Sequence, residues 1–78
     1  MIRFRLKELL AEKSFQEGRR VTLDEVSKGT GIHRTTLSKV ANQRGYTTNT
    51  DIVDKLCAYF GVPVENVAQY VDDEEVQG

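Results

Sequence analysis

The sequence predicts a compact all-α domain of five helices, with short extended segments at the two termini. Two observations carry this prediction: apolar residues recur at helical spacing through most of the chain, and glycines and one proline separate the periodic stretches. Seventy-eight residues suffice for a single domain, which we expect to span residues 1–71, before an acidic tail at residues 72–78. So small a chain leaves no room for a deep catalytic cleft, and we expect no enzyme.

The periodicity of the amino-terminal residues changes near Leu6. Ile2 and Phe4 alternate with arginines, which is typical of a short strand, whereas from Leu6 onward the apolar residues follow a helical spacing. We therefore expect the first helix to run from about Leu6 to Ser14. Residues 15–20 are polar apart from one phenylalanine and contain a glycine, which predicts a loop.

Residues 22–41 have the pattern of two short helices joined by a glycine-containing turn. Thr22 is a suitable first cap, and Glu25 three residues later completes a capping box. Ser27 is small enough for the two helices to cross closely, and Gly31 can adopt the positive φ that a sharp turn requires. The apolar contacts of the second helix are expected from Ile32, Leu37 and Val40. This is the helix-turn-helix pattern.

Two further helices are expected after this motif. Asn49, or Thr48 with Asp51, supplies the cap of the fourth helix, and Gly61 ends it. The buried face of the fourth helix is expected to hold Ile52, Val53, Leu56, Cys57 and Phe60. Pro63 fits the first turn of a fifth helix, where its missing N–H costs nothing. The inner face of the fifth helix is expected to hold Val64, Val67 and Ala68.

Residues 69–71 favour a β-strand and precede a run of acidic residues. The extended segment at the amino terminus needs a pairing partner. We therefore expect residues 2–5 to pair with residues 69–72, either within one chain or between subunits.

The motif at residues 22–41 and the Tyr-Phe-Gly-Val-Pro-Val-Glu junction at residues 59–65 together resemble the Cro and phage-repressor family of DNA-binding domains, also called the XRE family. The resemblance covers roughly residues 4–70 and implies one helix before the motif and two after it. It also implies a transcriptional regulator that binds double-stranded DNA, acting as a repressor by occupying its operator with the second motif helix in the major groove. A homodimer on an inverted repeat would supply the second half-site that so small a domain needs.

The second helix of the motif has a polar side and an apolar side. At about 100° per residue, the polar side holds Thr35, Ser38, Lys39 and Asn42, with Arg34 at its border. The opposite side holds Leu37, Val40 and Ala41. Hydroxyl side chains allow close approach to base edges, and an arginine can make a bidentate contact to guanine. By the resemblance, base contacts fall on His33, Arg34, Thr35, Ser38 and Lys39.

Cations and polar residues on both sides of this helix are candidates for phosphate contacts. They are Arg19, Arg20, Lys28, Thr36, Asn42, Arg44 and Tyr46. The family usually has a glutamine at the position of Leu23, which cannot hydrogen-bond a phosphate, so anchoring must come from elsewhere. It also has an acid at the position of Ala41, and we expect this alanine to pack against apolar residues.

Charge is distributed unevenly along the chain, although its net value is only −1. Residues 1–45 hold ten Lys and Arg against five Asp and Glu, whereas residues 46–78 hold one against seven. A basic half that contains the motif provides the attraction that a phosphate backbone needs. Charges on a merely solvated surface are the competing explanation.

Two single residues of chemical interest have structural explanations. His33 is expected to cap the second motif helix or to contact a phosphate, because no second histidine or paired carboxylates accompany it as metal ligands. Cys57 is expected to be a buried thiol, with no histidine to activate it. We therefore expect no metal, no cofactor and no small-molecule effector. The charged start and the lack of a long apolar run indicate a cytoplasmic protein without membrane contact.

A protein-interaction module on the same fold, such as an antitoxin or an adaptor, is the alternative function. Its second motif helix would meet an acidic partner. The leucine at position 23 and the acidic carboxyl half support this alternative.

Overall fold

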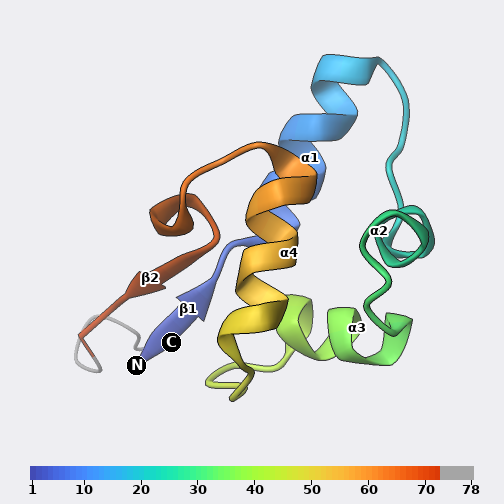
Figure 1. Cartoon of the computed structure of the whole chain (residues 1–78). Helices are drawn as coiled ribbons and strands as arrows, with labels where there is room; N and C mark the ends of the chain where they lie inside the picture. Colours follow the sequence, from blue (N-terminus) through green and yellow to red (C-terminus); the bar gives the residue numbers. More distant parts are fainter. Residues whose placement is uncertain (73–78) are drawn as a thin grey trace.

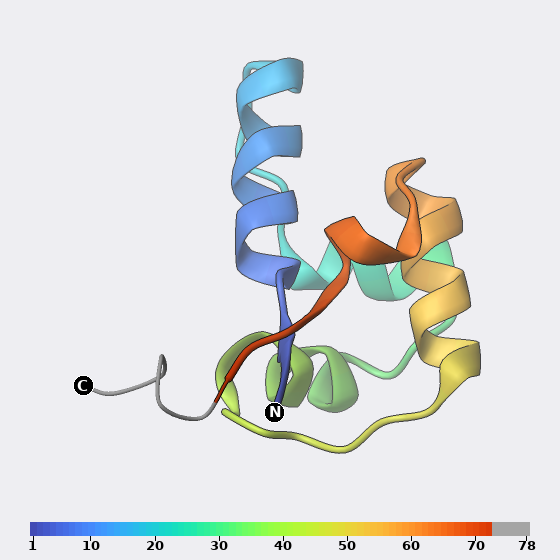
Figure 2. The same ribbon diagram turned by 90° about the vertical axis from the view of Figure 1, so that its left-hand side faces the viewer.

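The computed structural model describes residues 1–72, and helices make up most of that part of the chain (Figure 1). The elements in chain order are β1 (Ile2–Phe4), α1 (Leu6–Glu17), α2 (Leu23–Thr30), α3 (Arg34–Asn42), α4 (Thr50–Phe60), the 3-10 turn η1 (Val64–Asn66) and β2 (Ala68–Tyr70). In both views α3 lies at the lower end of the domain, and α1 and α4 rise away from it (Figure 1, Figure 2). Most of the expected acidic tail, residues 73–78, lies outside the described residues.

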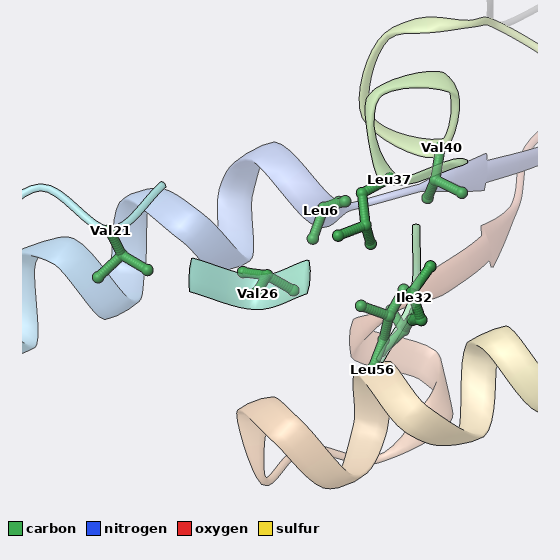
Figure 3. Packing of buried hydrophobic residues seen from close by; sticks show 8 residues of the cluster. Leu6, Val21, Val26, Ile32, Leu37, Val40 and Leu56 are labelled. Atoms are coloured by element: carbon green, nitrogen blue, oxygen red, sulfur yellow. The ribbon is translucent and has the colours of Figure 1, made fainter. Parts of the chain in front are cut away.

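Buried apolar side chains from the helices, the loop before α2, the turn of the motif and the segment before β2 form the core. They are Leu6, Val21, Val26, Ile32, Leu37, Val40, Leu56 and Val67. Figure 3 shows this cluster between α1, the motif and α4. The three apolar residues expected to anchor the second motif helix are all among them, so that prediction is confirmed. Because fully burying one such side chain is worth roughly 1.5–3 kcal/mol, this set holds α3 against the rest of the domain.

The side-chain caps expected for α2, α3 and α4 are present. Thr22, His33 and Asn49 accept the backbone N–H of a residue two or three positions later, at 3.3, 3.1 and 2.9 Å. Each cap satisfies a backbone donor that has no partner within the helix. Helix α4 ends at Phe60, where Gly61 adopts a φ of 66°. The sequence therefore located these helix ends correctly.

Helix α1 is longer than the apolar pattern predicts. We expected it to end at Ser14, but it continues to Glu17 and stops at Gly18, which adopts a φ of 67°. The prediction failed because it followed only apolar residues: Phe15 is 85% exposed, and the last turn needs no burial. An ion pair between Lys13 Nζ and Glu17 Oε2, at 2.9 Å, lies along this turn.

The two terminal strands pair with each other in an antiparallel register. Ile2 lies opposite Tyr70, and Phe4 lies opposite Ala68. The Met1 amino group donates to the Val71 carbonyl at 3.0 Å, and the Val71 N–H donates back to the Met1 carbonyl at 2.9 Å. The expected pairing of the termini is thus confirmed within one chain, but the paired strands span residues 2–4 and 68–70 rather than 2–5 and 69–72.

The expected fifth helix is wrong. The chain after Pro63 forms only the single 3-10 turn η1, followed by Val67 and then directly by β2. Strand pairing explains this outcome. Ala68 is already paired with Phe4, so the residues between Pro63 and Ala68 are too few for an α-helix. Of the three residues expected on its inner face, Val67 is buried, whereas Val64 is 56% exposed.

Candidate nucleic-acid interface

The turn between α2 and α3 is held by hydrogen bonds of its own small residues. Gly31 has a φ of 77°, and its N–H donates to the Ser27 carbonyl at 2.8 Å. The Ser27 hydroxyl donates to the Ile32 carbonyl at 2.6 Å. The Thr30 hydroxyl donates to the Val26 carbonyl at 2.7 Å and accepts the Ile32 N–H at 3.1 Å. These bonds fix the direction of α3 relative to α2, so Ser27 contributes a hydroxyl as well as its small size.

Helix α3 is anchored on one side and open on the other. Leu37 and Val40 are buried, with 0% and 3% of their surfaces exposed. The residues of α3 and its cap that are exposed are His33, Arg34, Thr35, Lys39 and Asn42, and those that are half-buried are Thr36, Ser38 and Ala41. The candidates for base contacts therefore lie on or beside the side of α3 that faces away from the core.

An ion pair connects the first turn of α2 to the first turn of α3. Arg34 Nε lies 2.7 Å from Asp24 Oδ1, and the two side chains are 64% and 66% exposed. The sequence did not predict this pair, because the partners stand in different helices at no helical spacing. It places a carboxylate beside the arginine that is the main candidate for reading guanine.

Arg19 is occupied by two carboxylates. Its two terminal nitrogens donate to the two carboxylate oxygens of Glu25 at 2.7 and 2.8 Å, and Nη2 also lies 3.0 Å from Glu17 Oε1. The hydrogen bonds from Arg19 lower the pKa of the Glu25 carboxyl below its ordinary value. Arg20 and Lys28 are exposed and make no ion pair with any residue in 1–72. These two cations are therefore less compensated than Arg19 on the α2 side of the interface.

A surface groove of about 290 Å³ lies between the start of α1 and the end of α3. Its lining includes Lys7 and Arg3 from the amino-terminal region, and Asn42 and Arg44 from the end of α3 and the loop that follows. The Asn42 amide donates to the Ser38 carbonyl at 3.0 Å, which orders the last turn of α3. Two phosphate candidates thus line the same groove as Lys7, which was not among the candidates.

Several residues singled out in the sequence pack against the core. Leu23 and Ala41 are partly buried against it, so apolar contacts replace the polar groups usual at these two positions, as expected for Ala41. Tyr46 is also partly buried there, which leaves less of its surface for a phosphate than the sequence suggested. Cys57 packs against the core but is half-buried rather than fully buried.

A family model described as a Cro/C1-type HTH DNA-binding domain matches residues 5–73 of the chain. The chain belongs to this family. The match includes the motif, the helices on both sides of it and β2, so this Cro/C1-type domain is a DNA-binding regulator in general terms. No curated protein sequence matches the chain.

The described part of this Cro/C1-type domain holds neither a metal-binding cluster nor a membrane-spanning helix. In residues 1–72 no group of three or more His, Cys, Asp or Glu side chains is placed to hold a metal ion. None of the helices there has the length and apolar character to cross a membrane. His33 caps α3 by accepting the Thr35 N–H at its Nδ1 atom.

Two residues beside α3 could not be found from the sequence of the Cro/C1-type domain. Asp24 lies in the first turn of α2, where an acid suits the positive helix end, and its spacing in the sequence does not indicate Arg34 as a partner. Lys7 lies near the start of α1, and no pattern in the sequence relates it to Asn42 and Arg44, with which it lines the groove. Both positions depend on how separate elements pack, which residue spacing in the sequence does not reveal.

Proposed function

We propose that this Cro/C1-type domain is a sequence-specific transcriptional regulator that places α3 in the major groove of double-stranded DNA. The observation that carries the proposal is the exposed polar side of α3, held outward by buried Leu37 and Val40. A helix of this kind fits a major groove that is about 12 Å wide. The base contacts would come from His33, Arg34, Thr35, Ser38 and Lys39. The protein would act in the cytoplasm as a repressor by occupying its operator.

Phosphate contacts on both sides of α3 would set the register of the domain on DNA. On the α2 side, Arg20 and Lys28 make no ion pair with residues 1–72, so their charges are available. On the other side, the groove lined by Lys7, Asn42 and Arg44 presents polar and basic groups at the end of α3. Such contacts position a protein but carry no sequence information themselves. Arg19, Thr36 and Tyr46 remain further candidates.

A homodimer on an inverted repeat would complete the site. One recognition helix covers few base pairs, and a second copy raises affinity by making its contacts intramolecular. The exposed Ile2 and Tyr70 side chains on the paired strands offer an apolar surface for that copy. The two copies of α3 would then enter successive major grooves, with half-site centres about 34 Å apart.

Selection of binders from a library of random duplexes tests this proposal. A sequence-specific regulator should enrich one motif with inverted symmetry. The enriched duplex should bind roughly 10³-fold or more tightly than random duplex at the same salt concentration. Enrichment of no motif, with equal affinity for all duplexes, would contradict it.

A protein-interaction module on the same fold is the second candidate function. The observation that favours it is Leu23, whose packing against the core leaves no amide at the position where the family usually holds a phosphate. In that case α3 would contact an acidic protein surface through Arg34 and Lys39. Failure of the duplex selection would favour this candidate.

A further inference from the structure

We propose that Asp24 is a positioning residue that makes Arg34 selective for a base edge over the phosphate backbone. The proposal rests on the proposed function, because it assigns a task within the same interface. Its basis is the ion pair across the turn, in which Arg34 Nε lies 2.7 Å from Asp24 Oδ1.

The geometry of this pair leaves Arg34 able to read guanine. The contact is made at Nε, the inner nitrogen of the guanidinium group. Each of the two terminal nitrogens carries two further N–H groups, and together they form the fork that matches O6 and N7 of guanine. No residue in 1–72 other than Asp24 forms an ion pair with Arg34. The carboxylate therefore holds the base of the fork while its tips remain available.

Holding the guanidinium in advance favours the specific complex. A long arginine side chain loses rotamer freedom when it is ordered on a base, and a side chain that is already held loses less. Asp24 stands in the first turn of α2 and Arg34 in the first turn of α3, so the pair is fixed to both helices of the motif. The hydrogen-bonded turn between these helices keeps the two positions in register.

The same carboxylate weakens binding to random DNA. A guanidinium next to a carboxylate presents almost no net charge, so it gains less from phosphates and releases fewer counterions. A hydrogen bond to guanine depends on the donor fork and is less affected by the neighbouring charge. Asp24 therefore strengthens binding to the specific duplex and weakens binding to random duplex. Both effects raise the ratio of specific to random affinity.

Structural stability does not account for this pair. The side chains are 66% and 64% exposed, and an ion pair so accessible to water contributes little to folding. Arg19 shows the contrast, because its two carboxylate partners join the end of α1 to the start of α2 and use both of its terminal nitrogens. The Asp24 pair leaves the reading end of its arginine unused.

The test compares Asp24→Asn with a matched control, Asp51→Asn. Asp51 stands at the same position of α4, second after the cap, and pairs with Lys55 at 3.0 Å, but it lies outside the motif. Affinities for the selected duplex and for random duplex are measured at one salt concentration. Asp24→Asn should lower the ratio of specific to random affinity about threefold to tenfold, whereas Asp51→Asn should leave the ratio unchanged. Asp24→Glu should restore part of the ratio.

A double-mutant cycle asks whether Asp24 acts through Arg34. In an Arg34→Ala background, Asp24→Asn should change the ratio by less than about 1.5-fold. An equal fall in the ratio with and without Arg34 would overturn the proposal, as would a ratio that Asp24→Asn leaves unchanged while the parent protein prefers its site. A parent protein without any preferred site would overturn the proposed function and this inference together. Circular dichroism of each variant verifies that the fold is retained.

Discussion

Ile2 and Tyr70 lie opposite each other across β1 and β2, and 46% and 75% of their surfaces are exposed. Beside this pair, a groove of about 310 Å³ runs between the amino terminus and residues 45–48. The strand pairing is already satisfied within one chain, so a second copy would not need to exchange strands. The second copy would instead pack on the exposed side chains of Ile2 and Tyr70.

We expect Tyr70→Asp to convert a dimer into a monomer. The new carboxylate would have to be buried without a partner at the interface, which is strongly unfavourable. Sedimentation velocity with and without duplex measures the change, and affinity for an inverted repeat should fall more than affinity for a half-site.

Phe15→Asp is the matched control for this substitution. Phe15 is also an exposed aromatic residue, with 85% of its surface accessible, but it stands in the last turns of α1. Its substitution should not alter the oligomeric state. A protein that is monomeric before any substitution, or a Tyr70→Asp variant that stays dimeric, would refute the proposed interface.

Leu37→Ala should destabilise the fold by roughly 2–5 kcal/mol, because it leaves a cavity under α3. Leu37 is completely buried in the core. Thr35→Ala, two residues earlier on the exposed side of the same helix, should change stability by less than about 0.5 kcal/mol. Urea denaturation of both variants gives the comparison, and similar losses for the two would mean that α3 is not anchored as described.

Local chemistry explains which parts of this fold the sequence predicted. Thr22, Gly31 and Asn49 act within three or four residues of themselves, by capping a helix or by adopting a positive φ. Such effects depend on residue type and short spacing, both of which are visible in the chain. The motif and the ends of its helices were therefore predictable.

Contacts between distant elements explain what the sequence did not reveal. The fifth helix was expected from Pro63 and its neighbours. Ala68 instead pairs with Phe4 at the other end of the chain, so only a 3-10 turn forms before the strand. The partner of Arg34 was missed for the same reason, since Asp24 reaches it only after α2 and α3 have packed. Such contacts between distant residues cannot be predicted from residue spacing alone.

Gly29→Ala should destabilise the protein, although alanine is the better helix former. A Cβ at Gly29 would lie 2.4 Å from Cε1 of the Tyr59 ring, so the ring or α2 must shift. The ring packs against the core and makes an edge contact with Phe60, which limits its movement. We expect a loss of about 1–3 kcal/mol, measured by urea denaturation.

In a Tyr59→Ala variant, we expect Gly29→Ala to lose its destabilising effect. With the ring removed, Gly29→Ala should be neutral or should stabilise by up to about 1 kcal/mol, as expected in an unobstructed helix. A loss of the same size in both backgrounds would show that the close contact is not the cause.

Acid should weaken the contact between α1 and α2. Hydrogen bonds from Arg19 lower the pKa of Glu25 below its ordinary value of 4.5. The unfolded chain therefore binds this proton more readily, so the stabilisation is complete above the ordinary value and is lost as the pH falls through the lower, folded value. Glu25→Gln should remove this stabilisation at neutral pH. In acid, the stability of the Glu25→Gln variant should approach that of the parent protein.

Urea denaturation from about pH 7 to about pH 3 checks this linkage. Arg19→Gln should reduce the acid dependence further, because Arg19 is a partner of both Glu25 and Glu17. A difference between the parent and Glu25→Gln that grows toward acid would have the wrong sign for a lowered pKa.

Residues that contact bases should respond to substitution differently from residues that contact the phosphate backbone. Arg34→Ala or Lys39→Ala should cost about 1–3 kcal/mol on the selected duplex and much less on random duplex, because a base contact exists only on the right sequence. Arg20→Ala or Arg44→Ala should instead weaken binding to both duplexes alike. The latter pair should also flatten the dependence of affinity on salt, since each lost phosphate contact releases about one counterion fewer. Titrations of both duplexes at several salt concentrations measure the two effects together. If Arg34→Ala lowered both affinities equally and flattened the salt dependence, Arg34 would be a phosphate anchor, and the reading of sequence would have to lie in the other exposed residues of α3.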